Sequence, residues 1–300
     1  MTKGKVDALL GIVFGDEGKG KVVDYFTPRY DVVARFAGGP NAGHTIIFDG
    51  KKFVLRSIPS GIFDEGKINI IGNGCVIAPD LFMSEAHELE AAGYELTKRL
   101  HISRRAHLIL PTHRVLDRAY EAAKGKNKVG TTGKGIGPTY SDKAARVGLR
   151  VGDILHNFDE KYKALKARHE QILRDLHYTD YDITEEEQKW MQGIEYMRKF
   201  NLTDTEYELN HALAEGKNVL AEGAQAHCST STMAPTPMCH HHPPQVVVSA
   251  PDWALPPTAL AMCSAFSRHT APVWVVAPSP SSCLTKLATP FATLATNMVL

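Results

Sequence analysis

Residues 15–21 of the chain read Gly15-Asp16-Glu17-Gly18-Lys19-Gly20-Lys21, directly after an apolar run from Val6 to Phe14. An apolar run followed by a glycine-rich turn is typical of a buried strand that leads into a phosphate-binding loop and a helix. Glycines let the backbone turn tightly, and consecutive N–H groups can then bind phosphate oxygens. The stretch therefore predicts an α/β fold with an anion site at the end of its first strand.

The loop departs from the usual phosphate-loop pattern at one position. The pattern G-x-x-x-x-G-K fits residues 15–21, but Val22 stands where it needs Ser or Thr to bind Mg²⁺. Asp16, inside the loop, offers the carboxylate oxygen that Mg²⁺ prefers. We therefore expect Asp16 to replace the missing hydroxyl as a metal ligand.

The composition limits the class of protein. The chain has 300 residues and a formal net charge of +1, which gives no reason to expect a nucleic-acid or membrane partner. No apolar stretch approaches the roughly 18 residues of a membrane-spanning helix. Cys75 is the only cysteine before Cys228, so no disulfide framework is expected over that part. These features predict a protein of the cytoplasm.

Strand and helix patterns alternate through the first three quarters of the chain. Besides Val6–Phe14, strands are expected at Tyr30–Phe36, Ile68–Ile71 and Asn218–Ala221. Helices are expected at Lys19–Phe26, Asp80–Ala92, Thr112–Lys124, Phe158–Leu176 and Ile183–Phe200, with Asp80 as an N-cap and Gly93 as a stop. This alternation predicts a mainly parallel central sheet with helices on both faces and with ligands at the carboxyl ends of the strands.

The composition changes abruptly at Gln225. Residues 226–300 contain none of the 24 glycines, 11 of the 17 prolines and three of the 67 charged residues. A folded α/β domain needs glycine at its turns and charge on its surface. We therefore divide the chain into an organised part, 1–225, and an aberrant Pro/Ala/Ser/Thr-rich tail, 226–300, which we expect to be disordered or non-native.

Two further segments combine glycines with reactive side chains. Residues 37–45 read AGGPNAGHT, and residues 130–140 read GTTGKGIGPTY. A third motif, Glu222-Gly223-Ala224-Gln225, follows the last expected strand. Each segment alone could be an ordinary turn, but a chain that needs only turns has no reason to surround all of them with Asp, Asn, His, Thr and Lys.

In this order, the motifs resemble those of the adenylosuccinate synthetase family over residues 5–225. The resemblance implies a fold related to phosphate-loop proteins, incomplete here at its C-terminus. It also implies a GTP-dependent carbon–nitrogen ligase, a homodimer of AMP biosynthesis that joins IMP to L-aspartate through 6-phosphoryl-IMP. One Mg²⁺ ion is the implied metal.

The resemblance also implies residue roles. Asp16 would be the catalytic base, His44 the general acid, and Lys19 a catalytic cation, with Asp16 and the Gly43 carbonyl on Mg²⁺. GTP would be bound by Gly15, Asp16, Glu17, Gly18, Lys19, Gly20, Lys21, Gly43, His44 and Thr45. IMP would be bound by Asp16, Glu17, Gly18, Lys19, Asn41, Ala42, Gly43, His44, Thr132 and Gln225, and by Arg146 acting on the neighbouring subunit's site.

Each site residue also has a structural interpretation. Asp16 could only cap the following helix, His44 could be a buried structural imidazole, and Glu222 could only bind backbone N–H groups. Lys134 and Lys143 are interpreted as solvated charges on a loop. His240–His242 cannot all bind one ion from a regular element and are not predicted to form a metal site.

A frameshift explains the tail. When the codons that residues 227–234 permit are regrouped by one base, they allow the string LLDIDYG, which resembles the family's continuation after EGAQ. The regrouping also works for 248–258 and 261–280, and it explains why glycines disappear. The hypothesis is a single-base deletion just after Gln225.

This hypothesis leaves two rival functions open. The first is a catalytically inactive fragment that retains at most weak binding of GTP or IMP phosphate. The second is a phosphate-loop NTPase that acts as a switch, which the missing Ser or Thr after Lys21 argues against.

Overall fold

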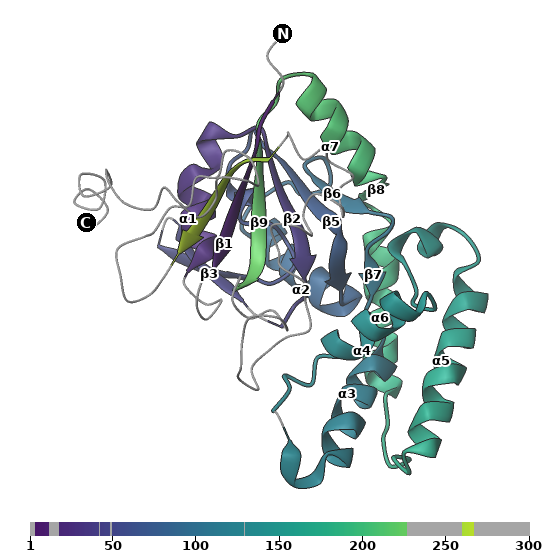
Figure 1. The fold of residues 1–300 in the computed structure, drawn as a ribbon. Coiled ribbons are helices and arrows are strands. Elements are labelled where there is room, and N and C mark those ends of the chain that lie inside the picture. Colours follow the sequence, from purple (N-terminus) through teal and green to yellow (C-terminus); the bar gives the residue numbers. More distant parts are fainter. Residues whose placement is uncertain are drawn as a thin grey trace.

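The computed structural model describes residues 4–11, 18–41, 43–48, 50–128, 130–226 and 260–266. Strands and helices alternate in this part of the chain (Figure 1). The strands are β1 (Val6–Gly11), β2 (Val32–Gly38), β3 (His44–Phe48), β4 (Lys51–Leu55), β5 (Ile68–Ile77), β6 (Leu100–Ser103), β7 (His107–Leu108), β8 (Asn201–Thr203), β9 (Val219–Ala226) and β10 (Leu260–Phe266). The α-helices are α1 (Lys19–Phe26), α2 (Pro79–Ala91), α3 (Pro111–Ala123), α4 (Ile136–Ala145), α5 (Phe158–Asp175), α6 (Thr184–Met197) and α7 (Thr205–Ala214).

The central sheet has the strand order β10-β1-β9-β2-β5-β6-β8, with β7 beside β5. Every neighbouring pair in this sheet is parallel. A parallel sheet places the carboxyl ends of its strands at one edge, so the segments that follow β1, β2 and β9 leave the sheet side by side. The predicted α/β class with a mainly parallel sheet is confirmed.

Helices cover both faces of the sheet. Val32, Ala34 and Ala221 on one face pack with Leu209 of α7. On the opposite face, Val33 and Leu220 pack with Val22 and Val23 of α1. Successive strand residues point to opposite faces, so the near-continuous apolar runs of β2 and β9 supply both cores.

A group of helices, α3, α4, α5 and α6, lies beside and below β7, at the lower right of Figure 1. Trp190 of α6 is fully buried there and donates its indole N–H to the carbonyl of Ile109, at 2.6 Å. Its ring stacks on Tyr162 of α5, with centroids 5.2 Å apart. Trp190 and Tyr162 belong to the same hydrophobic core as Ile77 and Ile102 of the sheet, so α5 and α6 extend the core on this side of the molecule.

The positions of the predicted elements are largely confirmed. Helix α1 has the predicted bounds, α3 is displaced by one residue, and α5 ends one residue early. Strand β5 extends to Ile77, six residues beyond its predicted end. The last residues of the first predicted strand, 12–14, lie outside the described residues.

The predicted N-cap of α2 is wrong. Helix α2 begins at Pro79, with Ala78 as the N-cap residue. Proline is favoured at the first helical position, because its missing N–H has no intrahelical partner there. Asp80 lies one position further on, and its carboxylate accepts two hydrogen bonds from the Arg114 guanidinium, at 2.6 and 2.9 Å.

The glycine-rich segment after residue 130 is not only a loop. It contains α4, which begins after Gly135 in a left-handed conformation with φ of 76°. The Lys134 ammonium donates to the Pro40 carbonyl at 3.0 Å, and the Lys143 ammonium donates to the Asn73 carbonyl at 3.1 Å. The prediction that both lysines are solvated loop charges is therefore wrong.

One segment of the predicted non-native tail joins the sheet. Residues 260–266 form β10 and pair with β1 along its outer edge. The outer edge of β1 offers unpaired N–H and C=O groups, which an extended apolar segment such as LAMCSAF can satisfy. The pairing of these seven residues with β1 does not test the expectation of a disordered or non-native tail, which stays a prediction. Among the described helices, none has both the length and the apolar character needed to cross a membrane.

Candidate functional site

Some of the predicted site residues lie near the carboxyl edge of the sheet. Strands β9 and β2 are adjacent there, so the segment that follows β2, with Asn41, emerges beside the end of β9. Gly15, Asp16, Glu17 and Ala42 lie outside the described residues, as do His240–His242. For Gln225 the structure gives the backbone at the end of β9.

The end of the phosphate-loop motif is close-packed against the hairpin that carries His44. Gly18 is left-handed, with φ of 80°, and α1 begins directly after it. A Cβ atom on Gly20 would lie 2.8 Å from the His44 Cβ and 3.3 Å from the Ser60 Oγ. Only glycine allows this approach, so the sequence at position 20 fixes how near α1 comes to His44. Lys19 is 2% exposed, whereas the Lys21 side chain is exposed.

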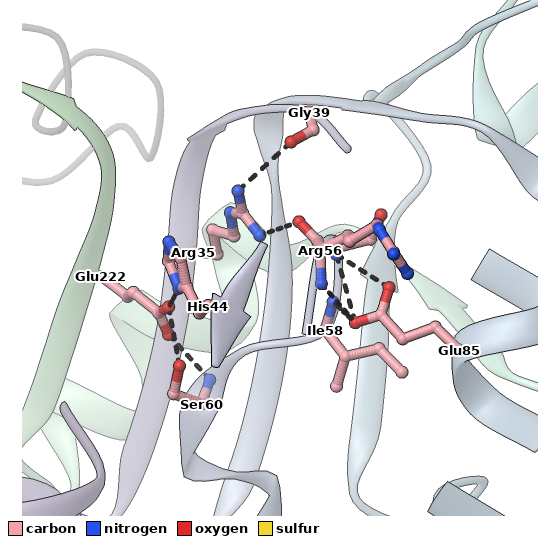
Figure 2. A network of polar contacts seen from close by, with 9 residues as sticks. Arg35, Gly39, His44, Arg56, Ile58, Ser60, Glu85 and Glu222 are labelled. Carbon is pink, nitrogen blue, oxygen red and sulfur yellow. Dashed lines mark hydrogen bonds and ion pairs between the residues drawn. The ribbon is translucent and has the colours of Figure 1, made fainter. Parts of the chain in front are cut away.

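His44 begins β3 and forms an ion pair with Glu222 of β9. Its Nδ1 lies 2.8 Å from Oε1 of Glu222, and the two side chains are 8% and 0% exposed. Glu222 also accepts the Ser60 N–H at 2.8 Å and the Ser60 hydroxyl at 3.0 Å (Figure 2). Strand β9, the β3–β4 hairpin and the chain after β4 are therefore joined at one carboxylate.

Burial alone would raise the pKa of Glu222. The hydrogen bond and charge of His44, the charge of Arg35 and the Ser60 N–H together hold that pKa below its ordinary value. Because an ionised carboxylate only accepts hydrogen bonds, we assign a proton to Nδ1 of His44. The other ring nitrogen, Nε2, is then the one available to a ligand.

Other predicted residues lie around this pair without a direct bond to it. Asn41 follows β2 and is half-buried, and Thr45 is next to His44 in β3. Thr132 is exposed in the segment that leads to α4. The hydrogen bond from Lys134 to Pro40 joins that segment to the turn that carries Asn41. Burial and the charges of Arg56 and Arg114 lower the pKa of Lys134.

Arg146 is placed away from this group. It caps the far end of α4 in a left-handed conformation with φ of 63°. The 10 residues of α4 separate it by about 15 Å of helix from the contact between Lys134 and Pro40. It lines a separate cavity of about 480 Å³ that also includes His107, Arg150 and Arg168. Within one chain, the structure does not bring Arg146 together with His44.

Several residues of the site were missed or undervalued from the sequence. Glu222 was noted only as a backbone-binding carboxylate, although its place in the EGAQ motif pointed to it. Ser60 and Arg35 carry no local signal, because the sequence does not show which distant segments they contact.

A second buried polar cluster joins His113, Asp142 and His169. Oδ2 of Asp142 lies 3.0 Å from Nε2 of His113 and 2.8 Å from Nε2 of His169. The three ligand atoms lie within 4.8 Å of one another, as in a metal site. However, Nδ1 of His113 accepts the Leu110 N–H at 2.8 Å, so its proton is on Nε2, the atom that would have to bind the metal. The cluster is a closed hydrogen-bond network that joins α3, α4 and α5.

Comparison with known proteins shows the family of the chain. The sequence profile described as adenylosuccinate synthetase matches residues 8–235. The chain belongs to the adenylosuccinate synthetase family.

Individual relatives show how much of the family's length is present. The chain is 69% identical to the adenylosuccinate synthetase of Phocaeicola vulgatus over 221 residues, which are 74% of this chain and 52% of the relative. It is 61% identical to the adenylosuccinate synthetase of Porphyromonas gingivalis, again over 221 residues that cover 74% of this chain and 52% of the relative. The chain therefore spans about half the length of the curated relatives it matches.

Solved structures agree on the fold. A fully ligated adenylosuccinate synthetase from Plasmodium falciparum superposes with a TM-score of 0.77 at 32% identity, over 87% of this chain and 61% of that chain. A succinoaminodeoxyadenylate synthetase of cyanophage S-2L, bound to dGMP and dATP, gives a TM-score of 0.61 at 20% identity, over 88% of this chain and 63% of that chain, which shows the fold alone.

Proposed function

We propose that this chain is an adenylosuccinate synthase, a GTP-dependent carbon–nitrogen ligase. The reaction joins IMP and L-aspartate with GTP to give adenylosuccinate through 6-phosphoryl-IMP, in AMP biosynthesis in the cytoplasm. The observation that carries the proposal is the buried pair of His44 and Glu222, packed against Gly20 at the start of α1. A histidine so placed lies beside a phosphate-loop motif, which is where a transferred phosphoryl group needs a hydrogen-bond donor.

His44 acts as the general acid in this proposal. The Glu222 carboxylate holds the ring through Nδ1, which leaves Nε2 as the atom that donates a proton to a phosphate oxygen. Lys19, buried at the start of α1, contributes positive charge close to the same loop. Asp16 is the proposed base that removes the N1 proton of the hypoxanthine ring, so that O6 becomes the nucleophile.

The binding residues are divided between the two nucleotides. GTP is assigned to residues 15–21 and 43–45, and the IMP ring and phosphate to residues 16–19 and 41–44 with Thr132 and Gln225. Lys134 supports the geometry of the IMP assignment, because its bond to Pro40 holds the segment of Thr132 against the turn of Asn41.

The proposed metal is one Mg²⁺ ion, which would neutralise phosphate charge when bound. Its protein ligands are Asp16 and the carbonyl of Gly43. Of these, Gly43 lies in the described part of the chain. It is exposed at the start of β3, next to His44, and a carbonyl oxygen is a ligand type that fits this hard cation.

The proposed assembly is a homodimer in which Arg146 reaches the IMP phosphate of the neighbouring subunit. Two observations support a role outside its own chain. Arg146 is exposed, and it lies at the end of α4 that points away from the His44 pair. Arginine suits this task because its guanidinium binds phosphate oxygens in pairs.

A second candidate is an inactive fragment that binds GTP or IMP weakly. The observation that favours it is the coverage of 52% of the relatives' length. The active ligase and the inactive fragment differ in whether they turn over substrate, but both would bind phosphate at the loop.

The test measures adenylosuccinate formed from IMP, GTP and L-aspartate by the chain and by two histidine variants. If the ligase proposal holds, His44→Asn lowers kcat by about 100-fold or more, as expected for loss of a transition-state hydrogen-bond donor. The matched control His211→Asn changes an exposed histidine of α7 and should leave kcat unchanged. Absence of turnover, together with calorimetric binding of GTP that His44→Asn weakens, would favour the inactive fragment.

A further inference from the structure

A buried arginine lies next to the site without being one of its predicted residues. Arg35 comes from the middle of β2 and is 1% exposed. Its Nη1 donates to the carbonyl of Arg56, and its Nη2 donates to the carbonyl of Gly39 at 3.4 Å (Figure 2). Both partners are backbone groups, so the guanidinium holds the course of the chain rather than another side chain.

The two carbonyls mark the ends of one segment. Gly39 is the first residue after β2, and Arg56 is the first residue after β4. The chain between them contains the β3–β4 hairpin and all the site residues predicted between 41 and 45. We propose that Arg35 is a positioning residue for His44, because its guanidinium joins the two ends of the segment that carries this histidine. The role in the reaction rests on the proposed function, whereas the geometric role does not.

Two buried carboxylates complete the arrangement. Glu85 of α2 accepts the N–H groups of Arg56, Ser57 and Ile58 at 2.8, 2.9 and 3.0 Å. Glu222 accepts both groups of Ser60, as described above. Residues 56–60 are therefore held by a carboxylate at each end, and Figure 2 shows Arg35 between them.

The charge of Arg35 acts on both carboxylates. Burial raises the pKa of Glu85 above its ordinary value, and Arg35 opposes that shift together with the three N–H groups. Arg35 is also one of the groups that lower the pKa of Glu222, the partner of His44. Removing the guanidinium therefore changes the geometry of the hairpin and the electrostatics of the His44 pair together.

The stability of the folded chain does not by itself explain why an arginine is buried at position 35. Removing a guanidinium from water costs several kcal/mol, and a buried apolar side chain of similar size is often equally stabilising. The Nε atom of Arg35 is buried and has no hydrogen-bond partner among the described residues. What an apolar side chain could not supply is the link between Gly39 and Arg56.

The test follows the His44 ring directly by NMR, using the complete 300-residue chain labelled with ¹⁵N. His44→Asn identifies the His44 signals by their loss. In Arg35→Met we expect the Nδ1–H signal of the bond to Glu222 to be lost or shifted, because Ser60 and the hairpin are no longer held. The matched control is Arg99→Met. Arg99 also donates to backbone carbonyls, those of Glu95, Ile62 and Asp64 at 3.1, 3.1 and 2.8 Å, but it does not close the His44 segment.

Arg35→Lys keeps the charge but can bridge the two carbonyls less well, so it should shift the His44 signals by less than Arg35→Met. If Arg35→Met does not fold, the comparison of Arg35→Lys with Arg99→Lys decides the question. Unchanged His44 signals in the folded Arg35 variants, or equal shifts in the Arg99 controls, would overturn the proposal. These spectra need no turnover, so failure of the ligase proposal would appear separately, as absent adenylosuccinate formation with the His44 signals behaving as expected.

Discussion

Nδ1 of His44 lies 2.8 Å from Oε1 of Glu222, although 178 positions separate the two residues in the chain. Both side chains are almost completely buried. The pair joins the β3–β4 hairpin to the central sheet close to the end of the phosphate-loop motif. The position of the hairpin and the proposed proton transfer by His44 therefore depend on the same contact. Several measurable consequences follow from this arrangement.

Glu222→Gln should destabilise the chain and impair the site. The variant leaves the Ser60 groups and His44 facing an amide, so charge-assisted bonds worth about 1.5–3 kcal/mol each are weakened inside the protein. We expect a loss of about 2–4 kcal/mol in the free energy of unfolding, measured by urea denaturation. Glu215→Gln, which changes an exposed carboxylate at the end of α7, is the control and should stay near the parent value. An equal loss in both variants would contradict the buried role of Glu222.

Gly20→Ala should separate α1 from the His44 hairpin. The added Cβ would lie 2.8 Å from the Cβ of His44, too close for contact without movement. Overpacking of this kind costs about 1–3 kcal/mol, and we expect weaker nucleotide binding as well. Gly137→Ala is the matched control, since its Cβ meets no atom within 4 Å and it lies in α4. Urea denaturation and GTP titration of both variants check the prediction, and normal GTP binding by Gly20→Ala would contradict it.

Stability should fall as the pH is lowered from 7 to 4. Burial lowers the pKa of His113 to about 4, and burial with the charges of Lys143 and Arg150 lowers that of His107 to about 4. Each group is neutral in the folded chain but takes up a proton in the unfolded chain below pH 6.5. The stability that each contributes is therefore present above pH 6.5 and is lost as the pH falls towards the folded pKa, by an amount on the order of 3 kcal/mol for each histidine.

The pH prediction is checked by urea denaturation at pH 7, 6, 5 and 4. The variant His107→Gln removes one of the two titrating groups, so its stability should fall less steeply over the same range. The exposed control His211→Asn should keep the slope of the parent chain. Identical slopes for all three chains would show that His107 does not titrate as described.

The existence of the main strands and helices could be predicted from sequence because their signals are local. The apolar run of β1, the glycine loop and α1 lie within one continuous stretch, and the same holds for β2 and the segment after it. The β3–β4 hairpin was missed because Lys51 and Lys52 interrupt its apolar pattern. Its buried face is recognised only from tertiary contacts, in which Phe53 packs against Phe63 and Tyr94.

Polar partners were harder to predict than apolar cores. Helix α4 was missed because glycine and proline, poor helix formers, occupy its first turn. Glu85 and Arg35 are charged residues that sequence patterns place on a surface, yet both are buried and form hydrogen bonds with backbone groups of other segments. Such partners depend on tertiary contacts over tens of residues, which no local pattern records.

The last prediction concerns the coding frame after Gln225. If a single base was lost there, restoring it should give the LLDIDYG string and a chain closer in length to the family relatives. We expect the restored chain to form adenylosuccinate at least about 100-fold faster than the present chain, because groups that position the second substrate are regained. Resequencing the gene decides the premise: an unbroken frame with the codons of residues 226–300 confirmed would end the hypothesis. Equal rates from the two chains would instead show that residues 1–225 suffice for turnover.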